Sequence, residues 1–333
     1  MKSWKTILTL ACAAVMLAGS TGSGATYYSR TNGDWDDDHT WSFSDCTGGQ
    51  PPVGRGDYPQ GGDDAIVCGA RVVTLTAAAT VDSLYIDDGE VDTGACVLTI
   101  TDSGGLTIDA DELLDVSGSG GVTLSGGGTH TVNGTIELDT TNSDLTITGD
   151  NVTVDGTGEI DGQNDGALIS INGVTLTNGM DTIGITGALQ IVDGASNGSF
   201  TNNGIVDAND GTEASRDTLL IDVGGALDDS TTSADRWIVS ANGAILEFAS
   251  TIGTFGPLDG HFVMTTGDSS SEIRIYHSVV TDGQLQMSVG TLDINPDDPG
   301  GSDSVTMGDD VNYYMNVTGG QIEVAADETF THN

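Results

Sequence analysis

Acidic residues recur at a fixed interval in the middle of this 333-residue sequence. Four of them follow one another at a constant interval of 22, and two more lie two positions after the second and the third. The six residues are Asp115, Glu137, Glu159 and Asp181, with Asp139 and Asp161 beside them. Carboxylate oxygens are the ligands that Ca²⁺ prefers. If the interval is one turn of a regular structure, the column predicts a Ca²⁺-binding face; the alternative is a solvated surface whose charges salt screens.

Other acidic pairs could in principle hydrolyse a glycosidic bond, which needs two carboxyl groups. The doublets Asp63-Asp64, Asp87-Asp88 and Asp297-Asp298 lie among glycines, where turn chemistry accounts for them. With 50 acidic residues in the chain, such adjacency is expected by chance. The histidines and cysteines show no zinc-site spacing. We therefore predict no catalytic residue, and we keep a polysaccharide lyase or glycoside hydrolase as the alternative.

Threonines separated by one residue invite a third interpretation, a rod that binds ice or mineral. These pairs lie at 74/76, 99/101, 146/148 and 175/177, so that successive pairs start at intervals of 25, 47 and 29. Such uneven intervals do not predict one flat array. The preference of threonine for the outer face of a strand explains the pairs more simply.

A sequence repeat indicates which structure would carry these residues. Residues 129–139 and 151–161 match without a gap at an offset of 22, with identical pairs such as Val132/Val154 and Gly134/Gly156. Around them, short stretches alternate aliphatic residues with threonine and end in Gly, Asp or Asn, as in Leu145-Thr146-Ile147-Thr148. Such alternation is typical of strands with one buried face. We predict an all-β fold, a parallel β-helix (β-solenoid) of about 22 residues per coil.

The sequence divides into three parts. Residues 1–25 predict a signal peptide, with Lys2 and Lys5 before a short apolar run, and hence a secreted or cell-surface protein. Residues 26–70, rich in turn residues and containing Trp35 and Trp41, predict an N-terminal capping segment. Residues 71–333 predict the β-helix, regular to about residue 228 and looser after it. The sequence stops without a recognisable closing segment, which suggests a fragment of a longer protein. No segment is apolar for long enough to predict a membrane span.

Charge and cysteines limit the partners and the compartment. The formal net charge is −42, and both lysines fall in the predicted signal peptide. Such a surface repels nucleic acid and anionic lipid and attracts cations and basic surfaces. Cys46 and Cys68 are also separated by an interval of 22, and on adjacent coils they would lie within disulfide reach. We predict this bridge, with Cys68–Cys96 as the alternative.

Two resemblances bear on the class of protein. The run Gly33-Asp34-Trp35-Asp36, then Thr40-Trp41-Ser42 and Pro51-Pro52-Val53, resembles the opening of a bacterial surface-protein module and of the eight-glycine extracellular module that precedes β-helices. The remainder resembles the right-handed, pectin-lyase-like β-helix repeats of adhesin passengers and filamentous haemagglutinin-like exoproteins. These resemblances imply secretion and a role at a surface, and they imply no particular ligand.

The segment 154–163 (VDGTGEIDGQ) is similar to a strand near the start of polygalacturonase-type hydrolases. That resemblance implies the fold only. The Asn-Thr-Asp, Gly-His-Gly and Arg-x-Lys motifs that serve catalysis in that family do not follow in this chain.

Together these observations predict an exported structural or adhesive protein. We expect no cofactor other than Ca²⁺ on the acidic exterior. The expected partners are cations and an extracellular polysaccharide, matrix or cell-surface component.

Overall fold

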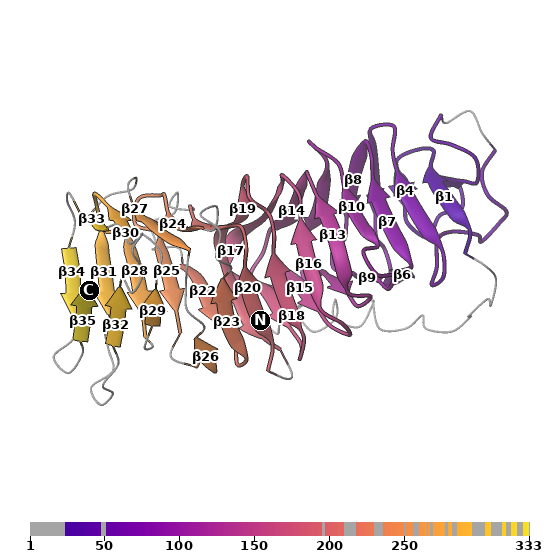
Figure 1. Ribbon diagram of the computed structural model, residues 1–333. Helices are drawn as coiled ribbons and strands as arrows, with labels where there is room; N and C mark the ends of the chain where they lie inside the picture. Colours follow the sequence, from indigo (N-terminus) through magenta and orange to yellow (C-terminus); the bar gives the residue numbers. More distant parts are fainter. Residues whose placement is uncertain are drawn as a thin grey trace, which may run out of the picture.

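The computed structural model describes residues 24–47, 51–194, 197–209, 218–229, 236–249, 251–255, 260–264, 266, 269–276, 279–281, 285–294, 304–307, 315–317, 321–324 and 329–332. The predicted signal peptide therefore lies almost entirely outside the described residues. Within those residues every regular element is a β-strand. No helix in that part of the chain is long and apolar enough to cross a membrane. The chain is a parallel β-solenoid, as the sequence predicts, and Figure 1 shows its strands stacked along one rod from β1 to β34 and β35.

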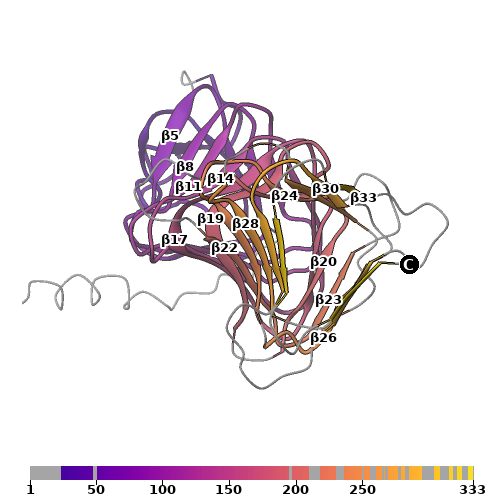
Figure 2. The same ribbon diagram turned by 90° about the vertical axis from the view of Figure 1, so that its left-hand side faces the viewer.

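The strands form three faces, seen from one end of the rod in Figure 2. Face A is an 11-stranded sheet made of β1 (Thr26–Ser29), β3 (Trp41–Ser42), β4 (Asp64–Val67), β7 (Ser83–Ile86), β10 (Leu106–Ile108), β13 (Gly128–Val132), β16 (Val152–Asp155), β18 (Thr175–Asn178), β20 (Ser199–Asn202), β23 (Ala226–Asp229) and β26 (Thr254–Phe255). The small sheet of β29 (Val279–Thr281), β32 (Ser304–Met307) and β35 (Thr329–His332) is separate from it.

A second sheet, of 21 strands, supplies the other two faces. Face B contains β2 (Gly33–Asp34), β5 (Arg71–Thr74), β8 (Gly89–Asp92), β11 (Leu113–Val116), β14 (Thr135–Leu138), β21 (Ile205–Ala208), β24 (Arg236–Val239), β27 (His261–Met264), β30 (Leu285–Met287) and β33 (Met315–Val317). Face C contains β6 (Ala79–Val81), β9 (Val97–Ile100), β12 (Gly121–Leu124), β15 (Asp144–Ile147), β22 (Thr218–Asp222), β25 (Ile245–Phe248), β28 (Glu272–Ile275), β31 (Thr291–Ile294) and β34 (Gln321–Val324). The long strands β17 (Glu159–Ile171) and β19 (Gly184–Asp193) pair with both faces and join them.

The coil length varies along the rod. Strands β11 and β14 of face B pair at the predicted interval of 22. In face A, by contrast, Thr129 pairs with Thr153, an interval of 24, and the next two pairings in that sheet have the same interval. The matched residues Val132 and Val154 therefore do not face each other. Because side chains alternate between the two faces of a strand, an offset of two positions keeps every inward residue inward, and the sequence pattern cannot distinguish the two registers.

Glycines at one corner are stacked on successive coils. Gly134 and Gly158 directly precede the paired residues Thr135 and Glu159, and the backbone N–H of Glu159 donates to the carbonyl of Gly134. A Cβ on Gly158 would collide with the carbonyl oxygen of Gly134. Position 158 is thus too tight for a side chain.

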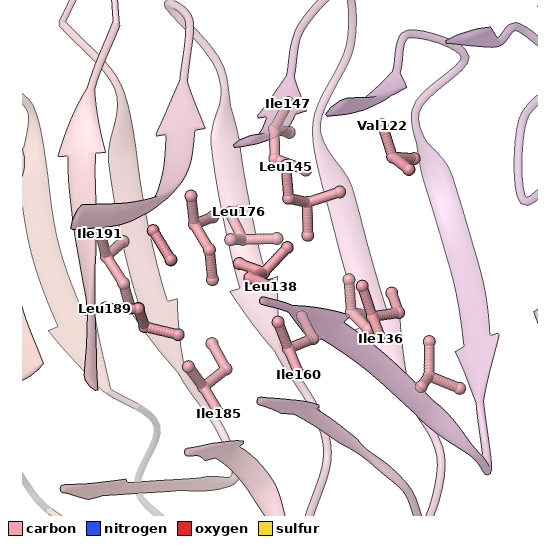
Figure 3. Close-up of a cluster of buried hydrophobic side chains, with 14 of the residues drawn as sticks. Val122, Ile136, Leu138, Leu145, Ile147, Ile160, Leu176, Ile185, Leu189 and Ile191 are labelled. Carbon is pink, nitrogen blue, oxygen red and sulfur yellow. The ribbon is translucent and has the colours of Figure 1, made fainter. Parts of the chain in front are cut away.

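The core is a stack of aliphatic side chains (Figure 3). Ile136, Ile160 and Ile185 occupy one register position on β14, β17 and β19, and all three are almost fully buried. Each strand contributes alternate residues in this way, while the intervening residues point outward. Parallel strands about 4.8 Å apart bring equivalent side chains into contact along the rod.

A short polar ladder interrupts the apolar stack. Asn178, Asn202 and Asp229 share one buried register position at the ends of β18, β20 and β23. Asn178 Nδ2 donates to Asn202 Oδ1 at 2.9 Å and to the Ile205 carbonyl at 2.8 Å. The carboxylate of Asp229 accepts from the indole Nε1 of Trp237 at 2.9 Å and from a backbone amide. These side chains thus bond to one another and to backbone groups at the corner.

The predicted capping segment, residues 26–70, adds β1, β3 and β4 to face A and β2 to face B. Trp35 and Trp41 are buried against each other with ring centroids 5.1 Å apart. Cys46 and Cys68 form a disulfide, with Cα atoms 5.7 Å apart. Their sequence separation of 22 is not one coil, because β3, which precedes Cys46, runs antiparallel to β1. The bridge instead fastens the loop after β3 to the end of β4.

Candidate functional site

The acidic residues that the sequence singles out lie on face B, although in a different arrangement. Asp92 pairs with Asp115, Asp115 with Glu137, and Glu137 with Asp161, on β8, β11, β14 and β17. We call these four residues the acidic ladder. Their side chains point outward, since the residues before and after each one in its strand point into the core or end the strand. Thr186 on β19 pairs with Asp161, and Asp207 on β21 pairs with Thr186, so these two residues continue the same register position.

The other predicted column members take separate positions. Glu159 faces Thr135 on one side and Gly184 on the other, so it belongs to the neighbouring column. Asp139 follows the end of β14 and is exposed. Asp181 is exposed and lies outside the strands, and it is not part of the acidic ladder.

One member of the acidic ladder was not predicted from the sequence. Asp92 precedes Asp115 by an interval of 23, so a search at a constant interval of 22 passes over it. The pairing of Asp115 with Glu137 does occur at the predicted interval and is confirmed. A search that allowed the interval to vary by two positions would have found all four members.

Stacking and partial burial make the two central carboxylates, Asp115 and Glu137, costly to ionise. Burial, followed by the charges of Asp92, Glu137 and other nearby acids, raises the pKa of Asp115 to about 6. Burial and the nearby charges of Asp139 and Asp161 also raise the pKa of Glu137. Like charges on neighbouring strands destabilise each other. The ladder therefore stores electrostatic repulsion that bound cations would relieve.

Hydroxyl groups donate hydrogen bonds to the first and last carboxylates of the acidic ladder. Ser117 Oγ donates to Asp92 Oδ1 at 2.7 Å, and Thr186 Oγ1 donates to Asp161 Oδ1 at 3.1 Å. By contrast, Asp115 Oδ1 is buried without a hydrogen-bond partner within the described structure. A positive charge would therefore stabilise the ionised carboxylate of Asp115 more than those at the ends of the acidic ladder.

The ladder does not form a cage for a single ion. Within the described ranges, the one group of three metal-ligand side chains with donor atoms within 4.8 Å of one another is Asp37, Asp38 and His39. That group lies in an exposed turn, where His39 Nδ1 is 3.1 Å from Asp37 Oδ1 and 2.7 Å from Asp38 Oδ1. Because Ca²⁺ needs six to eight oxygens, the ladder can only hold hydrated cations between neighbouring carboxylates or share them with a partner.

The repulsion at Asp115 gives a testable prediction. Asp115→Asn should raise the free energy of unfolding at pH 7 by about 1 kcal/mol, a value reduced from the pKa shift because the side chain is partly exposed. The pKa of Asp115 is higher in the folded than in the unfolded chain, so wild-type stability rises as this group takes up its proton between about pH 7 and about pH 4. The advantage of the variant should therefore shrink over that range in urea titrations. Asp88→Asn, in an exposed turn, is the matched control; an equal gain from it would contradict the prediction.

Comparison with known proteins adds no assignment. No protein-family model, no curated protein and no solved structure matches this chain.

Proposed function

We propose that the protein is an extracellular structural or adhesive rod that uses the acidic ladder to bind other anionic material through shared cations. The observation that carries the proposal is the in-register stack of Asp92, Asp115, Glu137 and Asp161 on four neighbouring strands. The solenoid core holds these carboxylates at the strand spacing of about 4.8 Å. The rod thereby presents a rigid line of negative charge.

A rigid line of carboxylates attracts divalent cations more strongly than a flexible one. The folded solenoid already holds the carboxylates close together, so they lose no further conformational entropy when cations bind. Cations held between neighbouring carboxylates keep coordination positions for oxygens of a second molecule, because the ladder alone does not complete a Ca²⁺ shell. An acidic extracellular polysaccharide supplies such oxygens along its length. We therefore expect Ca²⁺-dependent adhesion to acidic glycans.

The test is binding of the protein to an immobilised polyuronate, measured with Ca²⁺ and with a chelator. We expect binding that requires Ca²⁺ and is lost in the triple variant Asp115→Asn, Glu137→Gln, Asp161→Asn. The control variant Asp88→Asn, Asp111→Asn, Asp150→Asn removes the same charge from exposed turns and should bind as the wild type does. Equal loss in both variants would show a general charge effect and would contradict a role for the ladder.

The same samples should be assayed for new chain ends on the glycan. Turnover would favour the alternative, a carbohydrate-active enzyme, and would overturn the proposal of a non-catalytic rod. Calcium-independent binding would also contradict it, because direct contact between two polyanions is repulsive without a bridging cation.

A further inference from the structure

Face A carries a row of threonines that was not predicted from the sequence. Thr129 pairs with Thr153, Thr153 with Thr177, and Thr177 with Thr201, on the neighbouring strands β13, β16, β18 and β20. These strands lie side by side in Figure 1. We call these four residues the threonine ladder. The residue that follows each of them in its strand is buried, so the ladder points outward.

The hydroxyl groups of the threonine ladder have no bonding partner in the described part of the protein. Elsewhere in the chain exposed threonines bond to protein atoms: Thr101 Oγ1 donates to Asp82 at 2.8 Å, and Thr76 Oγ1 donates to Asp36 at 2.6 Å. Hydroxyls of the threonine ladder are thus left to bond with solvent or with a ligand. Each also presents a methyl group beside its hydroxyl, at the same position on every strand.

Further hydroxyl residues widen the row on both sides. Thr107 and Thr131 pair next to it on β10 and β13, and Thr175 and Ser199 pair next to it on β18 and β20. Asp155, which pairs with Thr131, ends the first of these columns with a charge. The threonine ladder is itself followed in register by an exposed acid, because Thr201 pairs with Asp228 on β23. In a chain with a formal charge of −42, the four threonines between these acids are neutral and do not favour a cation or a basic partner. It also lacks the aromatic residues that are enriched in protein interfaces.

The spacing of the patch fits a lattice of water. Neighbouring strands are about 4.8 Å apart. Water molecules joined by tetrahedral O–H···O bonds of about 2.75 Å place second neighbours about 4.5 Å apart. Over the three steps from Thr129 to Thr201 the accumulated mismatch stays below about 1 Å. Four hydroxyls held in register by a rigid sheet can therefore bond to one row of an ordered water layer.

We propose that the threonine ladder binds ice, so that the protein adsorbs to ice crystals through face A. The ladder supplies hydroxyls at the lattice repeat, and the methyl groups exclude disordered water between them. The sheet is already ordered before contact, which keeps the entropic cost of adsorption low. This binding is independent of the acidic ladder, which lies on face B.

A second row serves as the matched comparison. Thr80, Thr99, Thr123 and Thr146 pair in register on face C. There Asp144 lies two positions before Thr146 on the same face of β15, and hydroxyls next to the row bond to backbone carbonyls. Because the hydroxyls beside this row are already bonded to backbone carbonyls, the row is narrower than the one on face A, and face C is expected to contribute little.

The experiment measures ice shaping and the gap between melting and freezing points for the full chain. We expect the wild type to shape ice crystals and to open a hysteresis gap, and Thr153→Tyr to abolish both by placing a bulky ring on the row. Thr153→Val should reduce the gap, because it keeps the methyl group and removes the hydroxyl. Thr123→Tyr on face C should behave as the wild type does. Circular dichroism and thermal melts check that each variant folds.

Three results would overturn the proposal: folded wild type without any effect on ice, folded Thr153→Tyr with full activity, or an equal loss in Thr123→Tyr. Calcium-dependent glycan binding by the same preparations reports on the acidic ladder separately. A failure on ice with retained glycan binding, or the reverse, therefore identifies which proposal is wrong.

Discussion

Replacing Asn202 with alanine is expected to lower the free energy of unfolding by about 3 kcal/mol, because buried hydrogen-bonding groups lose their partner. Asn202 Oδ1 accepts from Asn178 Nδ2 at 2.9 Å and from the Gly204 amide at 3.2 Å. Its Nδ2 donates to the Arg236 carbonyl at 3.4 Å. Since Asn202 is fully buried, water cannot replace these bonds. Urea denaturation followed by circular dichroism measures the loss.

The neighbouring residue provides the control. Thr201→Ala changes an outward side chain on the same strand, β20, and should alter stability by less than about 0.5 kcal/mol. If Asn202→Ala costs no more than Thr201→Ala, the polar ladder does not stabilise the corner. Tryptophan fluorescence adds a local readout, because Trp237 donates to Asp229, the next member of the polar ladder.

Removal of the disulfide should also lower the free energy of unfolding, but at the N-terminal end of the solenoid. The double variant Cys46→Ser, Cys68→Ser opens a loop with a sequence separation of 22 residues, for which chain entropy predicts a loss of about 3 kcal/mol. The loss should be confined to the N-terminal end, because each coil of a solenoid contacts only its neighbours. Hydrogen exchange should show faster exchange around β1 and β4, with β13 to β20 unchanged.

A reducing agent provides the complementary measurement. Wild type with reductant should match the double variant, and the double variant should be insensitive to reductant. Exchange that accelerates uniformly along the rod would contradict local stabilisation. Unchanged exchange at β1 and β4 would show that the buried pair Trp35 and Trp41 holds this end without the bridge.

The fold class could be predicted from the sequence because its signals are local. Alternation such as Leu145-Thr146-Ile147 predicts a strand with one buried face, and Leu145 and Ile147 are indeed fully buried. The coil length could not be obtained in the same way. Matching identical residues favoured the offset of 22 that aligns Val132 with Val154, whereas the turns between strands set the register of this coil at 24.

That error of two positions also explains what was missed at the sites. An interval of 22 leads from Glu137 to Glu159, while the true partner of Glu137 is Asp161. The same error hid the threonine ladder, whose members recur at an interval of 24. A search for pairs such as 175/177 examines neighbours along one strand, although the ordered array runs across strands. A search at an interval of 24 would also have found the buried pair Asn178 and Asn202.

The ambiguity between offsets of 22 and 24 also concerns the folding chain. A strand displaced by two positions still buries its aliphatic side chains, so hydrophobic collapse alone does not reject the slipped arrangement. In the slipped form β16 would set Val154 against Val132. Between β18 and β20 a slip of two positions would set Asn178 against Phe200 instead of Asn202, so the buried asparagine pair of the polar ladder favours the native alignment there. We therefore expect this pair to fix the alignment of β20 on β18 when the solenoid folds.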